Sequence, residues 1–559
     1  MKLHRPVVFV ALLLGACTTE KIQYVTRPPF NQPPDAASGF LGYFTVSDKQ
    51  TTCGNCHVGQ QADWVQTLHA NAWDTLIANP GHQPFCEACH TVNSRGNRPL
   101  ATVGYDNVKD TAYHDVQCES CHGPGFDHVQ NPSIKANRPI ASAMVYPNVS
   151  TNAVVLTAAD TAAMVNSSCG ACHQGAGPSQ NHNYLAEWRS SRHGQLRQAQ
   201  AANVSCQQCH EGKGFLAFWG VNTLYKELGT TTLLPQNCVV CHDPHGTAKG
   251  ADGLPLPGQL RFPIDNPTNN LCTKCHNRTS DATASNSRGP HGSQGPVLFG
   301  TAGYFPPGSS YDTTAILTTH GSTANPRLCA GCHVNAQTGV DAFGTSISFT
   351  GHTFHPLPCL QQKSPPLVDT TYTNACAYDV PSRSWASCTT SGCHASETIA
   401  VQRLTAIRDE KEGYLKTLWV DLNGNRTLDA YPTDTGYLAK IKLNAPNDLD
   451  FTTPPYSTIL TPAKGALFNA QLTGEALTGH PDGSHGVHNP FLYRALLQAS
   501  IADLETTYGG AGGFLPAPPA PVLFKIQAAI RSGELKLAPR TTQAVMALTP
   551  SVRTRVSQR

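Results

Sequence analysis

The chain has 559 residues, of which 21 are cysteine and 24 are histidine, while only 14% are charged. Charged residues usually make up about a quarter of a soluble chain. The 39 basic residues nearly balance the 37 acidic ones, which argues against a nucleic-acid-binding surface, since such a surface needs a clustered basic excess. The hydrophobic fraction of 40% argues against disorder. The cysteines and histidines are therefore the feature to explain.

The first residues have the pattern of an export signal. A basic start precedes a short apolar run from Val7 to Leu14, which is far shorter than the ~18–20 residues of a membrane-spanning helix. The following Leu-Gly-Ala-Cys17 resembles the cleavage site of bacterial lipoproteins, in which the cysteine is lipidated. We expect residues 1–16 to be a lipoprotein signal peptide and residues 17–48 a tether. Thr18 then indicates sorting to the outer membrane, on its periplasmic or cell-surface face. An ordinary signal peptide with an incidental cysteine is the alternative.

Eight times the chain reads Cys-x-x-Cys-His. This is the attachment signature of c-type haem, in which two thiols add to the haem vinyl groups and the histidine becomes the proximal ligand of the iron. Zinc sites, disulfides or redox pairs would not require a histidine after every second cysteine. The cysteines are Cys53, Cys56, Cys86, Cys89, Cys118, Cys121, Cys169, Cys172, Cys206, Cys209, Cys238, Cys241, Cys272, Cys275, Cys329 and Cys332, and the histidines are His57, His90, His122, His173, His210, His242, His276 and His333.

A ninth motif has a wider spacing. Cys388, Cys393 and His394 resemble the CX4CH variant of some multihaem cytochromes, so we expect nine haem c groups as cofactors. Cys359 and Cys376 are left over, and they flank a proline-rich loop. A disulfide between them would contribute about 3 kcal/mol to stability, and a free pair would be unusual in an oxidising compartment.

Fourteen histidines lie outside the motifs and the signal, enough to give every iron a second histidine. A closed, bis-histidine iron favours electron transfer over substrate binding, and we expect no catalytic residue. His69 and His193 each follow a tryptophan by five residues, on a predicted short helix, and His128 and His245 follow shortly after a motif. The predicted distal ligands are His69, His128, His193, His245, His291, His320 and His488. Other candidates, among them His114, His182, His352, His355, His480 and His485, stay unassigned, and the pairing with particular irons stays open.

The first six motifs form an internal duplication, because corresponding cysteines recur about 120 residues apart. We expect duplicated three-haem modules over residues 49–250, haems 7–9 over 251–397, and a haem-free helical region with a linker and a basic tail over 398–559. In the last region, apolar spacing predicts a helix from Ala400 to Leu418, and Asn489 followed by Pro490 predicts the start of another.

A weaker signal lies between these two helices. Residues 421–429 resemble the first part of a calcium loop, but the glycine and the last carboxylate of that loop are missing. A polar turn is the better interpretation.

Two segments carry a resemblance to a known family. Cys118-Glu-Ser-Cys-His-Gly-Pro-Gly, with His128 after it, resembles a segment of the multihaem cytochromes that include cytochrome c554 and the octahaem reductases, and the Gly-Val-His-Asn-Pro around His488 is similar to another. The resemblance implies a mainly α fold with extensive loops, little β structure and a centre of packed haems. The CxxCK motif of many such reductases is absent.

Lipidation and nine haems instead resemble the outer-membrane cytochromes of metal-reducing bacteria. The expected function is haem-to-haem electron relay in respiratory or extracellular electron transfer. The expected partners are redox proteins or a porin-cytochrome complex, the membrane through the lipid anchor and a terminal electron acceptor, with no nucleic acid. A reductase of a nitrogen or sulfur oxyanion, or a filament-forming cytochrome, is the alternative.

Overall fold

The structure is a computed structural model. It describes residues 32–97, 102–141, 168–174, 183–221, 233–307, 316, 318–340, 346–362, 367–368, 375–390, 393–474 and 480–517. The predicted signal peptide, Cys17, part of the tether, His182 and the basic tail lie outside the described residues.

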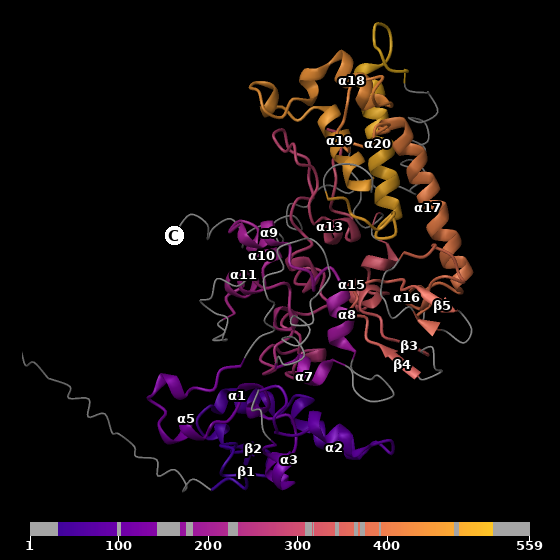
Figure 1. The fold of residues 1–559 in the computed structure, drawn as a ribbon. Coiled ribbons are helices and arrows are strands. Elements are labelled where there is room, and N and C mark those ends of the chain that lie inside the picture. Colours follow the sequence, from indigo (N-terminus) through magenta and orange to yellow (C-terminus); the bar gives the residue numbers. More distant parts are fainter. Residues whose placement is uncertain are drawn as a thin grey trace, which may run out of the picture.

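The N-terminal part consists of short helices around a small antiparallel strand pair (Figure 1). Its own apolar core is small and contains Phe40, Val92 and Tyr113. The elements are β1 (Tyr43–Thr45), β2 (Gln50–Thr51), α1 (Val58–Trp64), α2 (Ala72–Ile77), α3 (Tyr105–Val108), α4 (Cys118–His122) and α5 (Phe126–Gln130).

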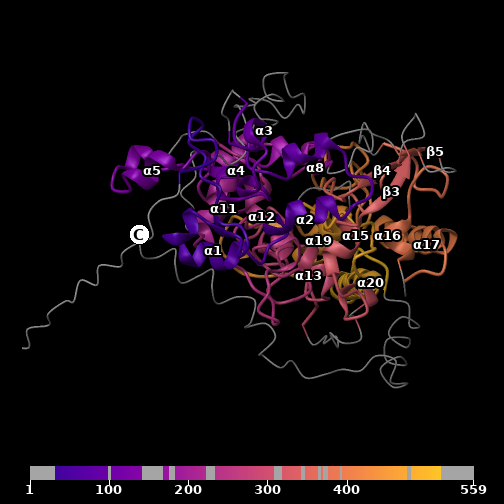
Figure 2. The ribbon, with the colours of Figure 1, turned by 90° about the horizontal axis from the view of Figure 1, so that it is seen from below.

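The middle of the chain continues with helices of one or two turns and a small mixed sheet of order β4-β3-β6-β5. The sheet and α17 lie on the side of the molecule opposite α5 (Figures 1 and 2). The elements are α7 (Gly170–His173), α8 (Tyr184–Ser190), α9 (Gln198–Ala202), α10 (Gln207–His210), α11 (Gly212–Phe218), α12 (Cys238–Cys241), α13 (Gln294–Leu298), α15 (Leu328–His333), β3 (Gln337–Val340), β4 (Ser346–Phe349), β5 (Leu360–Gln362), β6 (Leu367–Val368) and α16 (Ala386–Thr389).

The C-terminal part holds the longest helices: α17 (Glu397–Leu418), α18 (Tyr437–Asn444), α19 (Pro462–Thr473) and α20 (Pro490–Tyr508). Both predicted helices are confirmed, and Asn489 caps α20 by accepting a hydrogen bond from the Leu492 amide at 2.9 Å. Leu415, Leu438 and Leu497 belong to one buried cluster that joins these helices. Each fully buried leucine contributes about 1.5–3 kcal/mol, so this region has a larger apolar core than the N-terminal part.

The predicted mainly α class is confirmed, because the described strands form only two small sheets. Residues 421–429 form a polar turn, in which the Asp421 carboxylate accepts hydrogen bonds from the amides of Gly424 and Arg426 at 2.8 and 2.7 Å. In the part of the chain that the structure describes, no helix is long and apolar enough to cross a membrane.

The short helices around the two tryptophans differ from the sequence-based expectation. The first helix ends at Trp64 and the second at Ser190, so His69 and His193 lie beyond them. Each indole is anchored to a remote carbonyl, with Trp64 Nε1 donating to Val116 at 3.1 Å and Trp188 Nε1 to Gln236 at 2.7 Å. The chain turns after each anchor, which carries the histidine towards another motif. In both copies of the duplication, the residue that supplies the carbonyl stands two positions before the first cysteine of a motif.

The leftover cysteines form a disulfide, Cys359–Cys376. The buried Arg383 guanidinium donates to the carbonyls of Leu357 at 2.6 Å and Cys376 at 2.8 Å, and so ties both ends of the loop together.

We predict that the double variant C359S/C376S lowers the free energy of unfolding by about 3 kcal/mol, since the unfolded chain regains the entropy of an open loop. Denaturant unfolding would measure the loss. Thioether-bound cysteines resist thiol reductants, so dithiothreitol should destabilise the wild type and leave the double variant unchanged. An equal effect of the reductant on both proteins would contradict the assignment.

Candidate haem-binding sites

The nine cysteine–histidine motifs are numbered as sites 1 to 9 in chain order. In most of them the histidine amide bonds to the carbonyl of the first cysteine, which closes one helical turn. The N···O distances are 3.0 Å at sites 1, 4, 5 and 7 and 2.9 Å at site 6. A turn of this size brings both thiols and the imidazole to one side of the backbone, as attachment to one porphyrin requires.

Site 9 reaches the same closure with two more residues. The His394 amide bonds to the Cys388 carbonyl at 3.0 Å, just as the shorter motifs close on their first cysteine. The longer spacing therefore still presents two thiols and a histidine together, which fits a haem site. Site 2 differs, because the His90 amide bonds to Glu87 instead of Cys86.

Eight of the nine motif histidines face a second histidine from another part of the chain. One metal ion held at about 2.0–2.1 Å by a nitrogen of each ring would put the ring centroids roughly 6 Å apart. The observed centroid distances fit this value. They are His57–His128 6.4 Å, His69–His173 6.3 Å, His122–His245 6.1 Å, His193–His276 6.2 Å, His210–His291 6.1 Å, His242–His352 6.1 Å, His320–His394 6.2 Å and His333–His488 6.0 Å.

All seven predicted distal histidines are in these pairs. His352, which the sequence leaves unassigned, faces His242 of site 6. No local motif marks His352. Its position is set by Glu187, whose buried carboxylate accepts hydrogen bonds from the amides of Thr350 and His352, each at 2.8 Å.

Hydrogen bonds at Nδ1 orient the motif histidines. A carbonyl lies within bonding distance of Nδ1 in His90 (2.8 Å), His122 (3.0 Å), His242 (2.6 Å) and His333 (2.9 Å). A carbonyl accepts only from N–H, so the proton sits on Nδ1 and the Nε2 lone pair stays available to a metal. This is how metal-binding histidines are usually oriented.

Burial keeps several of these rings neutral, which is the form that binds a metal. Loss of solvation lowers the pKa of His193 to about 3 and the pKa values of His333 and His352 to about 4. Next to site 3, a cavity of about 440 Å³ is lined by Cys121, His122, Lys135 and Arg138. Such a volume is typical of ligand sites, and the two cations suit the propionates of a haem.

Site 2 is the exception to the pairing. Among the described residues, no histidine ring stands opposite His90, so the structure brings together eight of the nine expected pairs. The nearby His114 is stacked on Trp73, with ring centroids 3.8 Å apart. His355, His480 and His485, also unassigned by the sequence, are in none of the eight pairs.

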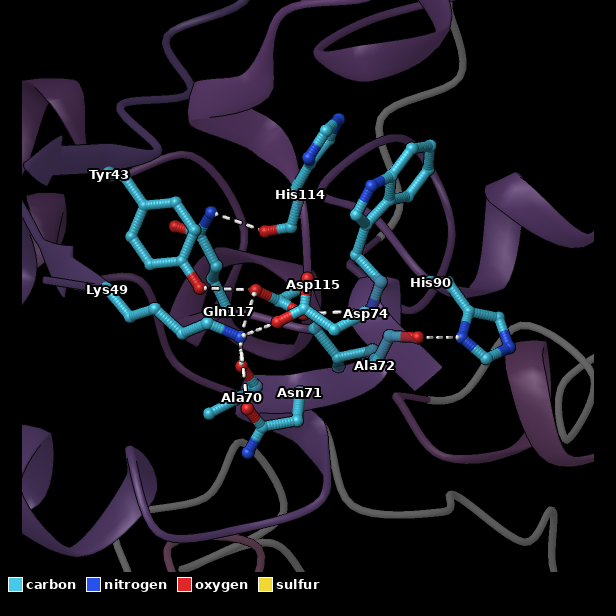
Figure 3. A network of polar contacts seen from close by, with 12 residues as sticks. Tyr43, Lys49, Ala70, Asn71, Ala72, Asp74, His90, His114, Asp115 and Gln117 are labelled. Atoms are coloured by element: carbon cyan, nitrogen blue, oxygen red, sulfur yellow. Dashed lines mark hydrogen bonds and ion pairs between the residues drawn. The ribbon is translucent and has the colours of Figure 1, made fainter. Parts of the chain in front are cut away.

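A polar network holds the segment between sites 1 and 2 (Figure 3). The Lys49 ammonium contacts the Ala70 carbonyl at 2.6 Å, Asp74 at 2.8 Å and Asp115 at 3.3 Å. Burial opposes the charge of Lys49, but its bonds to the two carboxylates raise its pKa overall. The segment carries His69, which faces site 4, and the Ala72 carbonyl, which orients His90. One network thus positions ligands for two sites.

Comparisons with known proteins match the segments that carry the motifs. A family model described as cytochrome c554 and c-prime matches residues 52–123, which contain sites 1 to 3, and a doubled CXXCH motif model matches residues 234–281, which contain sites 6 and 7. The chain is a multihaem c-type cytochrome. No curated protein matches it significantly.

One solved structure is similar to this cytochrome. It is described as the crystal structure of outer cell wall cytochrome OcwA, with 18% sequence identity, a TM-score of 0.42, and coverage of 84% of this chain and 100% of that chain.

Thiol contacts show which sites of the cytochrome are neighbours. The thiols of sites 1 and 3, of sites 2 and 4, and of sites 4 and 6 lie close enough together to shift each other's pKa values. The same is true of sites 5 and 7 and of sites 7 and 8. Thiols of sites 3 and 4, 6 and 7, and 8 and 9 are also close enough for one to raise the pKa of the other. The contacts among sites 1 to 4 therefore recur, three sites later, among sites 4 to 7.

We predict that H193A adds one high-spin haem that binds cyanide to those of the oxidised wild type, because His276 would lose the ring opposite it. Electron paramagnetic resonance would count the high-spin iron. The matched control H355A removes a histidine that is in none of the pairs and should leave the spectrum unchanged. An unchanged spectrum in H193A would show that this pairing is wrong.

A second prediction concerns Glu119 of site 3. Burial raises its pKa to about 7, although amides of Leu41, Gly42 and Gly125 donate to the carboxylate. Because this pKa is higher in the folded state than in the unfolded state, stability is greatest below pH ~4.5 and about 3 kcal/mol is lost as the pH rises through 7. The melting temperature of E119Q should therefore fall less between pH 5 and 7.5 than that of the wild type or of E412Q, which changes an exposed glutamate. An equal fall of the melting temperature in all three proteins would contradict the raised pKa of Glu119.

Proposed function

We propose that the chain is a lipid-anchored nonahaem cytochrome c that relays electrons in respiratory or extracellular electron transfer. The observation that carries the proposal is the set of eight facing imidazole pairs, each containing the histidine of an attachment motif. A site with two histidines leaves no ligand position open for a substrate. When bound, the haems supply one-electron transfer between neighbouring irons.

The residues of the chain have three roles in this proposal. The paired cysteines would attach each haem, and the motif histidine and its remote partner would hold the iron between them. Backbone carbonyls such as those of Pro139 and Gly258 hold the rings through Nδ1. Neutral, buried imidazoles keep water and small anions away from the metal. The protein thereby sets the spacing and the potential of each site, and the chemistry itself belongs to the cofactor.

The thiol contacts support a particular order of sites. Sites 1, 3, 4, 6, 7, 8 and 9 follow one another as a continuous line, with site 2 beside site 4 and site 5 beside site 7. We place the two ends of the relay at sites 1 and 9. Site 1 follows the proposed tether and Cys17, so a membrane-bound redox partner or a porin-cytochrome complex would meet the chain there. The terminal acceptor would meet site 9.

One observation favours a second function. His90 has no facing histidine among the described residues, and the His90 turn closes differently from that of the other motifs. An iron with one protein ligand could bind nitrite or a sulfur oxyanion, which is the chemistry of a reductase. Site 2 also lies beside the line of sites and not within it. Electrons could therefore reach a substrate there without interrupting the relay.

We predict nine covalent haems in the mature protein, each adding about 0.6 kDa by mass spectrometry. The variant C388S/C393S should lose one haem. An unchanged number of haems in this variant would show that site 9 binds none. The spectrum of the oxidised protein should show low-spin iron at eight sites, and a high-spin signal should disappear in C86S/C89S.

The same samples separate the two functions. Turnover of nitrite or a sulfur oxyanion by the reduced protein, abolished in C86S/C89S, would favour the reductase over the pure relay. Several high-spin signals at the paired sites would contradict both proposals. Protease treatment of intact cells would show on which face of the outer membrane the protein lies.

A further inference from the structure

The histidine that faces site 8 has an unusual hydrogen-bond partner. Nδ1 of His488 lies 2.6 Å from Oδ1 of Asp482, whose side chain is completely buried. Oδ2 of the same carboxylate accepts hydrogen bonds from the hydroxyls of Tyr493, at 2.9 Å, and Ser484. The His488 amide also bonds to the Ser484 hydroxyl at 3.2 Å. The carboxylate is thus held by fixed donors on both oxygens.

Other imidazoles in the eight facing pairs bond to weaker acceptors. Nδ1 of His320, which faces site 9, contacts the Val487 carbonyl at 2.7 Å, and Nδ1 of His276 contacts the amide oxygen of Gln294 at 3.1 Å. The Asp243 carboxylate is 3.7 Å from Nδ1 of His245, beyond hydrogen-bond distance. A buried carboxylate bound directly to Nδ1 therefore sets His488 apart from these ligands.

The position of Asp482 is fixed by the haem-free region. Its amide bonds to the Leu472 carbonyl at the end of α19, and Tyr493 belongs to α20. Gly486, with a φ of +95°, passes so close to α17 that a Cβ atom there would lie 2.7 Å from Cγ1 of Ile407. Three helices therefore hold the loop, and the contact between Asp482 and His488 does not depend on an exposed, mobile segment.

We propose that Asp482 is a positioning residue that makes His488 an electron-rich axial ligand and lowers the reduction potential of the haem at site 8. A carboxylate that accepts the Nδ1 proton increases the basicity of Nε2. A more basic ligand stabilises the oxidised iron more than the reduced iron, and axial ligands and their hydrogen bonds are known to set haem potentials. This inference rests on the proposed binding of a haem at site 8.

The consequence follows from the order of sites. The thiols of site 8 lie close to those of sites 7 and 9. In the proposed order, every electron that moves between sites 1 to 7 and site 9 therefore passes through site 8. A lowered potential there creates an energetic step before the end of the relay. The step is uphill from either side, so it would slow electron exchange between site 9 and the other sites without closing the path.

Two variants with opposite expected effects test the inference. In D482N the amide cannot draw the Nδ1 proton as a carboxylate does, so the equilibrium of one haem should shift towards reduction by roughly tenfold, or ~59 mV for one electron. In Y493F the carboxylate loses a donor and becomes a stronger acceptor. The same haem should therefore shift in the opposite direction. Spectroelectrochemical titration of the full holoprotein would resolve both changes.

The matched control is D434N, which changes a buried aspartate that accepts a hydrogen bond from Trp419 Nε1 at 2.8 Å, away from any motif histidine. It should leave every potential unchanged. If Asp482 only supports the loop, D482N and Y493F would shift the potential in the same direction or give high-spin iron, and the inference would fail. Loss of haem from the Cys329–Cys332 peptide in the wild type would instead refute the proposed function.

Discussion

The structure depends on bringing two histidines from different segments face to face. Each motif histidine is local to its cysteines, but its partner comes from a remote part of the chain, as when His333 faces His488. A haem held between such a pair would join the two segments. The connecting chain would then need only turns and short helices, which fits the small amount of regular structure around sites 1 to 7.

The helical region without motifs is part of this system. Its leucine-rich cluster gives α17 to α20 an apolar core of their own. The loop between α19 and α20 supplies His488, which faces His333 of site 8, and the Val487 carbonyl, which orients His320 at site 9. An ordinary hydrophobic core thus sets the geometry and the electrostatics of the last two sites. The earlier sites are set by small polar networks, such as the one around Lys49.

The two copies of the duplicated module share contacts but have diverged at one site. Trp64 and Trp188 make equivalent bonds, and the thiol neighbours repeat from one copy to the next. In the second copy, His210 of site 5 faces His291, whereas His90 of site 2 has no such partner among the described residues. The order of neighbouring sites is therefore the feature that the two copies share most clearly among the described residues.

The sequence by itself determined the cofactor class and the motif residues, because attachment requires two thiols and a histidine within one turn of the chain. The capped start of α20 at Asn489 was predictable for the same local reason. Only the tertiary structure decided which distal histidine meets which motif, since an imidazole can approach a metal from any segment. His352 has no recognisable local pattern, yet the Glu187 carboxylate brings it to site 6. His114 looks equally suitable in the sequence, but it packs against Trp73.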